Sequence, residues 1–298
     1  FAELDAALSA EDPARERLAS IAYRAGRIDE AERALRNAQG GMAHWLRAKL
    51  ALRRGDSEAA AAAYAQAIRA AGEGEVWTAR PDEIDVYRPS EAPVDTRCRI
   101  QAEAGIVALS RNDYLQAMDL FYAASARYWT DAAYLAERVL TVDELQGFVQ
   151  RVAPEPQRVQ NDEWVFGTRH HAAALRGLLA RRLLREDRGR EALLYFDDAD
   201  LQAQAQRYVA AREAVQRGDR VARARAGFAA AELARWQGME LLGTQLGPDF
   251  AEYGGMFSPG GRWIEVEVPG SAETEWRQVP AQPDPLALAD ERARIERS

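Results

Sequence analysis

The chain has 298 residues, and 47% of them are apolar, which is enough to bury a continuous hydrophobic core. Its 39 basic and 47 acidic residues give a formal net charge of −8, which argues against a sequence-independent nucleic-acid binder because such a protein needs a basic surface. Cys98 is the only cysteine, so the composition also excludes an intramolecular disulfide and a cysteine-based zinc site.

Residues 13–39 and 42–71 each have the pattern of two short helices joined by a turn. In the first unit, small residues stand at helical spacing and Gly26 closes the first helix. In the second unit, Gly55 takes the same place 29 positions later. The repeated spacing predicts two helical hairpins of one design.

Residues 97–128 show this design most clearly. The first helix has a thin face that includes Gly105 and Ala108, and the second alternates small residues with Phe121. Small residues let two helix backbones approach closely, and the aromatic ring fills the space one turn further on. We expect a tight turn at residues 110–113 to join the two helices.

Three further units are predicted, at residues 130–152, 169–200 and 201–243. In the first of them, Thr141 and Glu144 form a capping box that starts a new helix. Turns are expected at Gly189 and Gly218 in the other two. The last helix carries an apolar series consisting of Ala224, Phe228, Ala231, Leu233 and Met239.

Two stretches are irregular because their prolines forbid a regular helix, and they cover residues 72–96 and 153–168. Residues 244–282 are rich in glycine and proline, and within them 264–268 and 275–279 alternate as strands do, which predicts a small β-hairpin. Residues 283–298 are expected to begin a further helix whose partner is missing.

The chain begins with Phe1 rather than Met and shows no signal-peptide pattern. No run of 18 apolar residues is present, so no membrane-spanning helix is predicted. The unpartnered helix at the C-terminal end leads us to interpret the chain as a piece of a longer protein.

The second halves of the units resemble the tetratricopeptide repeat. The resemblance is carried by Gly26-x-Ile28-x-x-Ala31-x-x-x-Leu35-x-x-Ala38, by Gly55, Ala60, Tyr64 and Ala67, and best by Asn112, Tyr114, Ala117, Phe121 and Ala124. Gly105 falls where that repeat carries its small residue on the first helix. The spacing of 29 is shorter than the family's repeat of about 34 residues, and the usual closing proline is absent, so degenerate repeats and the related Sel1-like repeat both fit.

This resemblance implies an all-α fold in which residues 1–243 form a right-handed superhelix of αα-hairpins, an α-solenoid. In that family the first helix of each pair lines a concave groove. Lys49/Arg53 and Arg181/Arg185 are i,i+4 pairs that would present two cations on one helix face, suited to a carboxylate or an acidic peptide. The implied groove residues are Tyr23, Arg24, Trp45, Lys49, Arg53, Arg99, Arg181 and Arg185.

Two observations argue against the groove hypothesis. The asparagines of the family's carboxylate clamp are not matched, because Arg17, Leu46 and Glu103 stand in their places. Cations near the end of a helix also complement the helix dipole, which is a purely structural role.

No catalytic or metal-binding constellation is evident. Adjacent histidines such as His170 and His171 diverge by about 100° on a helix, so packing at the helix start is favoured over metal binding. The acidic run Asp197, Asp198 and Asp200 is interpreted as a solvated turn. Without a phosphate loop, a nucleophile elbow or an HExxH motif, we predict no enzymatic activity, no cofactor and no metal.

The leading hypothesis is a non-catalytic scaffold that binds a protein or peptide, including an acidic one, in the groove, with the loop at 72–96 contributing. The alternative is that the solenoid belongs to a larger cell-envelope enzyme or complex whose catalytic domain lies outside this chain. A third reading is a structural spacer. More loosely, residues 129–145 resemble segments of long repeat proteins from GC-rich bacteria, and a periplasmic or cell-envelope location is favoured over the cytoplasm.

Overall fold

The computed structural model describes residues 14–72, 95–156 and 169–246, together with Leu8, Ser9, Asp12, Trp77 and two strands in 261–280. The chain divides into two compact units, Phe1–Gly247 and Pro248–Ser298. Every regular element in the described part of the first unit is a helix, so the predicted all-α class is confirmed there.

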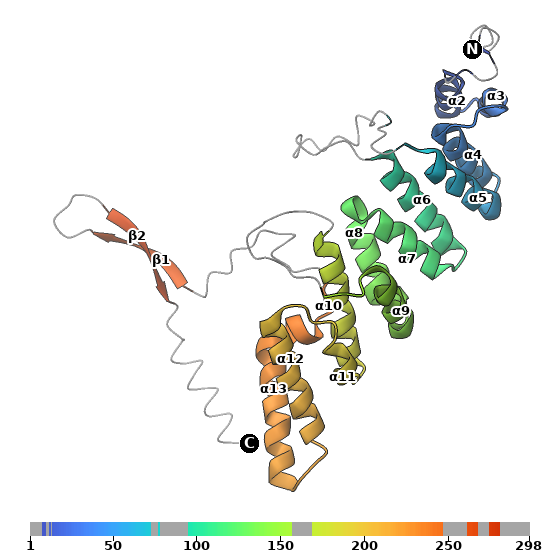
Figure 1. The fold of residues 1–298 in the computed structure, drawn as a ribbon. Coiled ribbons are helices and arrows are strands. Elements are labelled where there is room, and N and C mark those ends of the chain that lie inside the picture. The colour runs from blue at the N-terminus through green and yellow to red at the C-terminus, as the bar shows by residue number, and fades with distance from the viewer. Residues whose placement is uncertain are drawn as a thin grey trace. The chain divides into compact units, whose positions relative to one another are not determined.

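Figure 1 shows the order of these helices along the chain. They are α2 (Ala14–Arg24), α3 (Ile28–Leu35), α4 (Gly41–Arg53), α5 (Ser57–Ala70), α6 (Thr96–Ser110), α7 (Tyr114–Ala123), α8 (Ser125–Tyr134), the π-helical turn η2 (Leu135–Val139), α9 (Val142–Val152), α10 (Arg169–Arg185), α11 (Gly189–Ala192), α12 (Ala199–Ala214) and α13 (Arg220–Leu242). Among the described residues, no helix has both the length and the apolar character that crossing a membrane requires.

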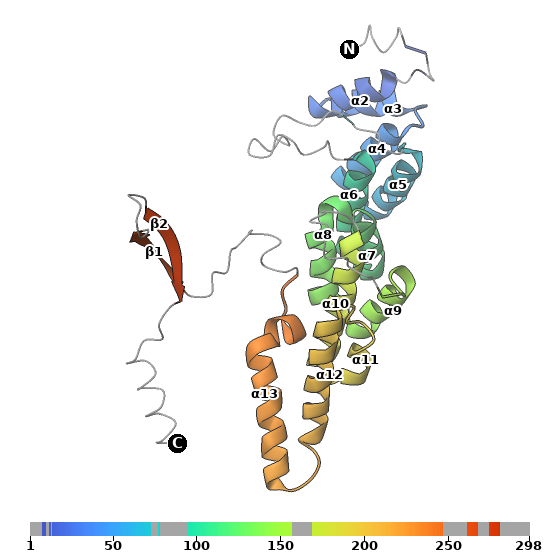
Figure 2. The same ribbon diagram turned by 60° about the vertical axis from the view of Figure 1, so that its left-hand side comes forward.

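The helices of the first unit pack mainly on their neighbours in the sequence (Figures 1 and 2). Helix α2 packs on α3 and α4, α4 on α5, α5 on α6, and α6 on α7 and α8. Helix α10 contacts α8, η2, α9, α11 and α13, and α12 packs on α13. Contacts restricted to neighbouring elements are typical of helical-repeat proteins.

Four turns between paired helices share one backbone design. Gly26, Gly55, Asn112 and Asp187 have φ values of 74°, 77°, 60° and 57°. In each turn the next residue donates its backbone N–H to the carbonyl five positions earlier, at 2.9–3.0 Å. This left-handed residue and its long-range bond satisfy carbonyls that the helix end leaves without donors.

The turn predicted at Gly189 is wrong, because Asp187 takes the left-handed conformation instead. Gly189 opens α11, and a Cβ at this position would lie 2.7 Å from Val209 Cγ2 on α12. The glycine therefore serves the close approach of two helices rather than the turn.

The predicted capping box at the start of α9 is confirmed. The Thr141 hydroxyl accepts the Glu144 backbone N–H at 3.3 Å, and the Glu144 carboxylate accepts the Thr141 backbone N–H at 2.8 Å. These bonds satisfy two donors that the first helical turn leaves free.

The thin-against-bulky interface predicted for residues 97–128 is present between α6 and α7. A Cβ on Gly105 would lie 2.7 Å from Phe121 Cε2, so the ring occupies the space that a side chain would need. Ala117, Phe121 and Ala124 are buried, whereas Tyr114 from the same predicted face is exposed.

The buried apolar side chains form three clusters along the first unit. The cluster around α2–α4 and the cluster around α4–α6 are built mostly from alanine. The third cluster spans α6–α13 and is rich in leucine, including Leu145, Leu175, Leu178, Leu179 and Leu183.

The apolar series expected to face inward on the last helix is largely exposed. Phe228 and Met239 are solvent-exposed on α13, while Ala230 and Leu241 are buried. Helix α13 therefore has apolar residues on two sides, and α12 covers only one of them.

In the second unit, β1 (Gly261–Glu267) pairs antiparallel with β2 (Thr274–Pro280). The register places Ile264 opposite Arg277. The irregular stretches predicted at 72–96 and 153–168 lie mostly outside the described residues, as does the helix predicted at 283–298.

Candidate binding site

Three of the predicted groove residues converge on the carboxylate of Glu103. Trp45 on α4 donates its Nε1–H to Glu103 Oε2 at 2.6 Å, and Lys49 Nζ lies 2.9 Å from the same oxygen. Arg99 on α6 donates from Nε to Glu103 Oε1 at 3.4 Å. We call these four residues the Glu103 cluster.

Tyr64 on α5 supports this carboxylate from the protein interior. Its ring is buried, and its hydroxyl donates to Glu103 Oε2 at 3.0 Å. Burial, followed by the neighbouring Glu103 charge, raises the pKa of Tyr64 well above its ordinary value. The phenol therefore stays protonated and remains a hydrogen-bond donor that holds the carboxylate in place.

The indole of Trp45 is the aromatic centre of the Glu103 cluster. The Lys49 ammonium lies 5.3 Å from the ring centroid and the Arg99 guanidinium 5.6 Å from it, both within cation–π range. Trp77 meets the same ring edge-on, with centroids 5.4 Å apart and an interplanar angle of 60°. These contacts fix the indole between two cations and a second aromatic ring.

The Glu103 cluster is partly exposed and carries two cations for one anion. The Glu103 carboxylate lies between these cations, so their charge is already partly neutralised within the protein. One formal positive charge remains beside an aromatic surface. Such a site can accept a carboxylate or an aromatic side chain from a peptide.

Three other predicted groove residues lie on α2 and α4. Tyr23 is half-buried and packs against the core cluster of α2–α4. Arg24 and Arg53 are the exposed last residues of α2 and α4. These two arginines add positive charge at the C-terminal ends of α2 and α4.

Arg181 and Arg185 have a different role from the one predicted. Arg181 donates to the carbonyls of Gly243 and Gln245 at 3.1 and 2.9 Å, and Arg185 donates to Gly243 at 2.6 Å. Arg185 also pairs with the buried Glu137 of η2. Carbonyls at a helix end lack intrahelical donors, and these arginines supply them for α13. The structure does not bring this pair to the Glu103 cluster.

Arg176 of α10 is a buried charge that sequence reasoning missed. Its side chain donates from Nε to both carboxylate oxygens of Asp197 at 2.9 Å. It also donates to the carbonyls of Ala153, Pro154 and Leu194 at 3.1, 3.2 and 2.8 Å. The sequence does contain a hint of this role, because Arg176 stands between leucines in a segment whose apolar residues predict a buried helix.

The interpretation of the acidic run as a solvated turn is therefore wrong for Asp197, which is the partner of Arg176. Asp198 is exposed just before α12 and caps this helix by accepting the Leu201 backbone N–H at 2.8 Å. Asp200 is exposed on the first turn of α12. A carboxylate in the first turn complements the helix dipole.

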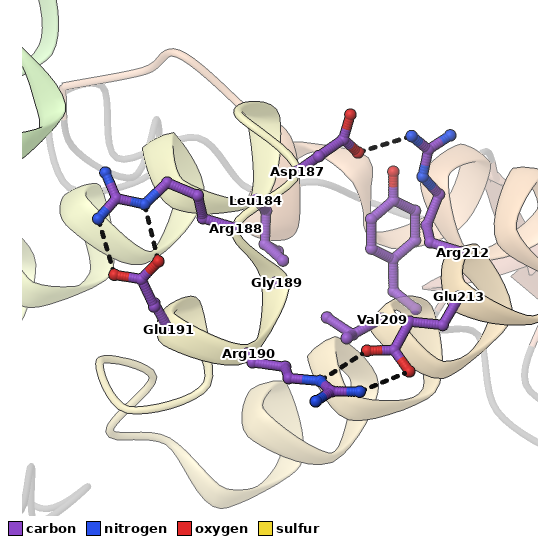
Figure 3. A pocket seen from close by; sticks show the side chains of 10 residues that line it. Leu184, Asp187, Arg188, Gly189, Arg190, Glu191, Val209, Arg212 and Glu213 are labelled. Atoms are coloured by element: carbon purple, nitrogen blue, oxygen red, sulfur yellow. Dashed lines mark hydrogen bonds and ion pairs between the residues drawn. The ribbon is translucent and has the colours of Figure 1, made fainter.

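A cavity of about 270 Å³ lies between α11 and α12 (Figure 3). Two ion pairs cross it, Arg212–Asp187 at 2.6 Å and Arg190–Glu213 at 2.9 Å. Because these charges neutralise one another, the cavity offers a ligand less unpaired charge than the Glu103 cluster does.

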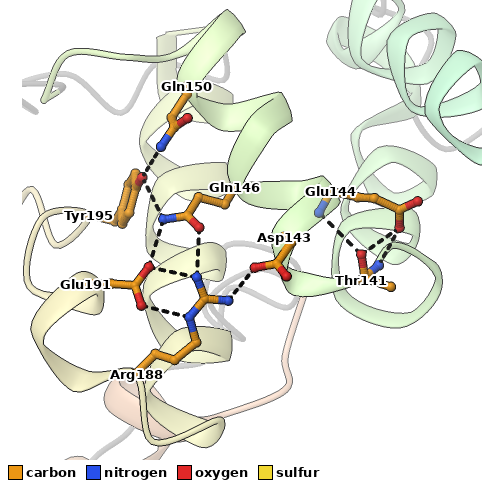
Figure 4. Close-up of polar contacts among 8 residues, drawn as sticks. All are labelled: Thr141, Asp143, Glu144, Gln146, Gln150, Arg188, Glu191 and Tyr195. Atoms are coloured by element: carbon orange, nitrogen blue, oxygen red, sulfur yellow. Dashed lines mark hydrogen bonds and ion pairs between the residues drawn. The ribbon is translucent and has the colours of Figure 1, made fainter.

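A polar network joins α9 to α11 (Figure 4). Arg188 donates to Glu191 through two nitrogens at 2.9 and 2.7 Å, and also to Asp143 and Gln146. Gln146 donates to Glu191 and Tyr195 in turn. The bonds from Arg188 and then Gln146 lower the pKa of Glu191 to about 2.

We expect this network to make the stability of the fold depend on pH in the acidic range. A carboxylate whose pKa falls from 4.5 to about 2 on folding stabilises the fold above pH 4.5, and this contribution is lost as the pH falls towards 2. Glu191→Gln should therefore lower the urea midpoint at neutral pH, and its difference from wild type should vanish near pH 2. Glu58→Gln, which alters an exposed carboxylate of α5, is the control. A deficit in Glu191→Gln that persists unchanged at pH 2 would contradict the prediction.

The histidine pair also has a packing role as far as it is described. The His171 ring stacks on Trp129, with centroids 4.6 Å apart and an interplanar angle of 2°. Its Nδ1 lies 3.1 Å from the Ser125 hydroxyl, while the His170 side chain lies outside the described residues. Within the described ranges, no group of three or more His, Cys, Asp and Glu side chains could hold a metal.

The Glu103 cluster is thus the site that unites the most predicted residues. It combines an aromatic platform, two cations and a fixed carboxylate on two helices. Comparison with known proteins found no matching family model, no similar curated protein and no similar solved structure.

Proposed function

We propose that this chain is a non-catalytic helical-repeat scaffold that binds a protein or peptide segment at the Glu103 cluster. The observation that carries the proposal is the partly exposed Trp45 indole held between Lys49 and Arg99. Partly buried hydrogen bonds from Tyr64 and Trp45 fix the central carboxylate, so the site is organised before a ligand arrives.

The repeat architecture is part of the same proposal. Four turns of one backbone design, the glycine–aromatic interface of α6 and α7, and contacts made mainly between neighbouring helices support a tetratricopeptide-like solenoid. In such a solenoid α4 and α6 are the first helices of adjacent pairs. Side chains from both would then line one concave surface.

The expected ligand is a peptide with a carboxylate and an apolar or aromatic side chain. Two cations surround one internal anion, and Arg53 adds a further exposed cation on α4. Arginine can bind a carboxylate through two parallel hydrogen bonds. The Trp45 ring would pack against the apolar side chain, a contact type that often dominates binding energy.

Lys49 is the only lysine in the sequence, which allows a direct test. Reductive ¹³C-methylation would label only Lys49 and the terminal amine, and the Lys49 NMR signal would then report on the site. We expect it to shift when short acidic peptides with free C-termini are added, and less with the same peptides amidated. Trp45→Ala should weaken binding roughly thirtyfold, as loss of a central tryptophan typically does.

Two further variants make this test decisive. Trp45→Phe keeps a ring on the platform and should retain part of the affinity, which separates loss of the site from loss of folding. Arg138→Glu alters an exposed cation of η2 and should leave binding unchanged. Acidic peptides that bind equally well to Trp45→Ala, or that leave the Lys49 signal in place, would refute the site.

A further inference from the structure

The exposed side of α13 carries an apolar stripe. Val221, Phe228, Trp236 and Met239 are 57%, 71%, 68% and 54% exposed. Val221 and Phe228 share one face, because a spacing of seven residues is close to two full turns, whereas Met239 follows a kink in α13 at Gln237. Trp236 flanks them.

This stripe lies on the side of α13 that faces away from α12. Ala230, the buried residue of α13 before the kink at Gln237, lies roughly half a turn around the helix from Val221. In Figure 2, α12 runs beside α13 along most of its length. A helix that is apolar on both sides is normally covered on both sides, so the stripe needs a second partner.

Charges beside the stripe indicate what the partner is. Arg225 and Glu232 are exposed on the same face as Phe228, one turn before it and one turn after it. No ion pair or hydrogen bond of either side chain is found within residues 169–246. Arg235 is also exposed on this face, and its guanidinium lies 5.3 Å from the ring centroid of the adjacent Trp236. Arg225 and Glu232, which stand on either side of Phe228, are complementary to the same two residues of a second copy in antiparallel orientation.

We propose that the chain self-associates through α13, with two copies packed antiparallel about a two-fold axis between residues 228 and 229. Arg225 then lies at the height of the partner's Glu232, because both are equally far from the axis along their helices. The same symmetry places Glu232 opposite the partner's Arg225. Val221 meets the partner's Trp236, and Phe228 lies against its own copy at the centre.

Small residues allow the two helices to approach. Ala224 and Ala231 are exposed on the flank of the stripe, one turn before Phe228 and one turn after it. Each can receive the bulky ring of the opposite copy, the same small-against-large design that α6 and α7 use. A two-fold interface repeats every contact, so both ion pairs and both apolar contacts form together.

The register can be tested with charge reversals in the full 298-residue chain, using sedimentation equilibrium over a range of concentrations. Wild type should show a concentration-dependent rise to twice the monomer mass. Arg225→Glu alone places glutamate opposite glutamate, and Glu232→Arg alone places arginine opposite arginine. Each should weaken self-association by roughly tenfold or more, since two attractive pairs become two repulsive ones.

An equimolar mixture of these two variants should recover wild-type association. In the mixed dimer every arginine again faces a glutamate, and the double variant Arg225→Glu/Glu232→Arg should recover it for the same reason. Arg207→Glu, an exposed charge on α12, is the matched control and should not alter association. Phe228→Glu should leave a monomer at all concentrations.

Three results would overturn the proposal. Wild type could remain monomeric, in which case the stripe is covered by another partner. The single reversals could associate as well as wild type, or the mixture could fail to recover association while each variant stays folded by circular dichroism. Either of the last two would remove the antiparallel register.

Discussion

Substituting leucine for Arg176 should lower the free energy of unfolding by about 3–5 kcal/mol. Arg176 is 1% exposed and donates to Asp197 and to three backbone carbonyls. Leucine would remove the guanidinium that pairs with the buried Asp197 carboxylate and would leave those carbonyls without these donors. Removing one member of a buried pair is costly because the remaining charge cannot regain its solvation.

Urea denaturation of the purified variant would measure this loss. A double variant, Arg176→Met with Asp197→Leu, should be less destabilised than Arg176→Leu, because it removes the buried Asp197 charge as well. Arg212→Leu breaks the exposed pair with Asp187 and should cost less than about 1 kcal/mol. If Arg176→Leu were no less stable than Arg212→Leu, the buried pair would contribute no more to the free energy of unfolding than the exposed pair does.

Gly105→Ala should lower the free energy of unfolding by about 1–3 kcal/mol, although alanine normally stabilises a helix relative to glycine by about 1 kcal/mol. The new Cβ would lie 2.7 Å from Phe121 Cε2, and the buried ring has little room to withdraw. Gly147→Ala on α9, where a Cβ meets nothing within 4 Å, is the control and should be neutral or stabilising.

A double-mutant cycle isolates the contact between these two residues. Phe121→Ala alone should cost about 3–5 kcal/mol because it opens a cavity between α6 and α7. In that background, Gly105→Ala should no longer destabilise, since the ring it clashes with is gone. If the effects of the two substitutions were additive, the contact between Gly105 and the Phe121 ring would not explain the cost of Gly105→Ala.

The sequence was most informative where a feature depends on residues close together in the chain. The left-handed conformation of Gly26 and Gly55 follows from glycine at a helix end, and the Thr141–Glu144 capping box spans a single turn. The approach of Gly105 to Phe121 was also predictable, because both helices belong to one hairpin. Such local rules gave the helices, most of the turns and the first-helix positions of Trp45 and Lys49.

Features that depend on distant segments were not predictable in the same way. Glu103 was noted only as a departure from a known motif, and its role appeared once α4 and α6 were side by side. Arg181 and Arg185 have the spacing of a ligand-facing pair, yet the end of α13, far along the chain, occupies them. The π-helical turn η2 and the exposed face of α13 likewise depend on which neighbour is present.

The division of the hydrophobic interior into three clusters has a mechanical consequence. A molecular motor that pulled the polypeptide from its N-terminal end would first meet helix pairs whose buried clusters, of seven and nine described residues, are small. Only later would it reach the large cluster that spans α6–α13, where Arg176 of α10 is bonded to Asp197. The molecule should consequently unravel in stages, yielding its weakest segments early and resisting longest around α10.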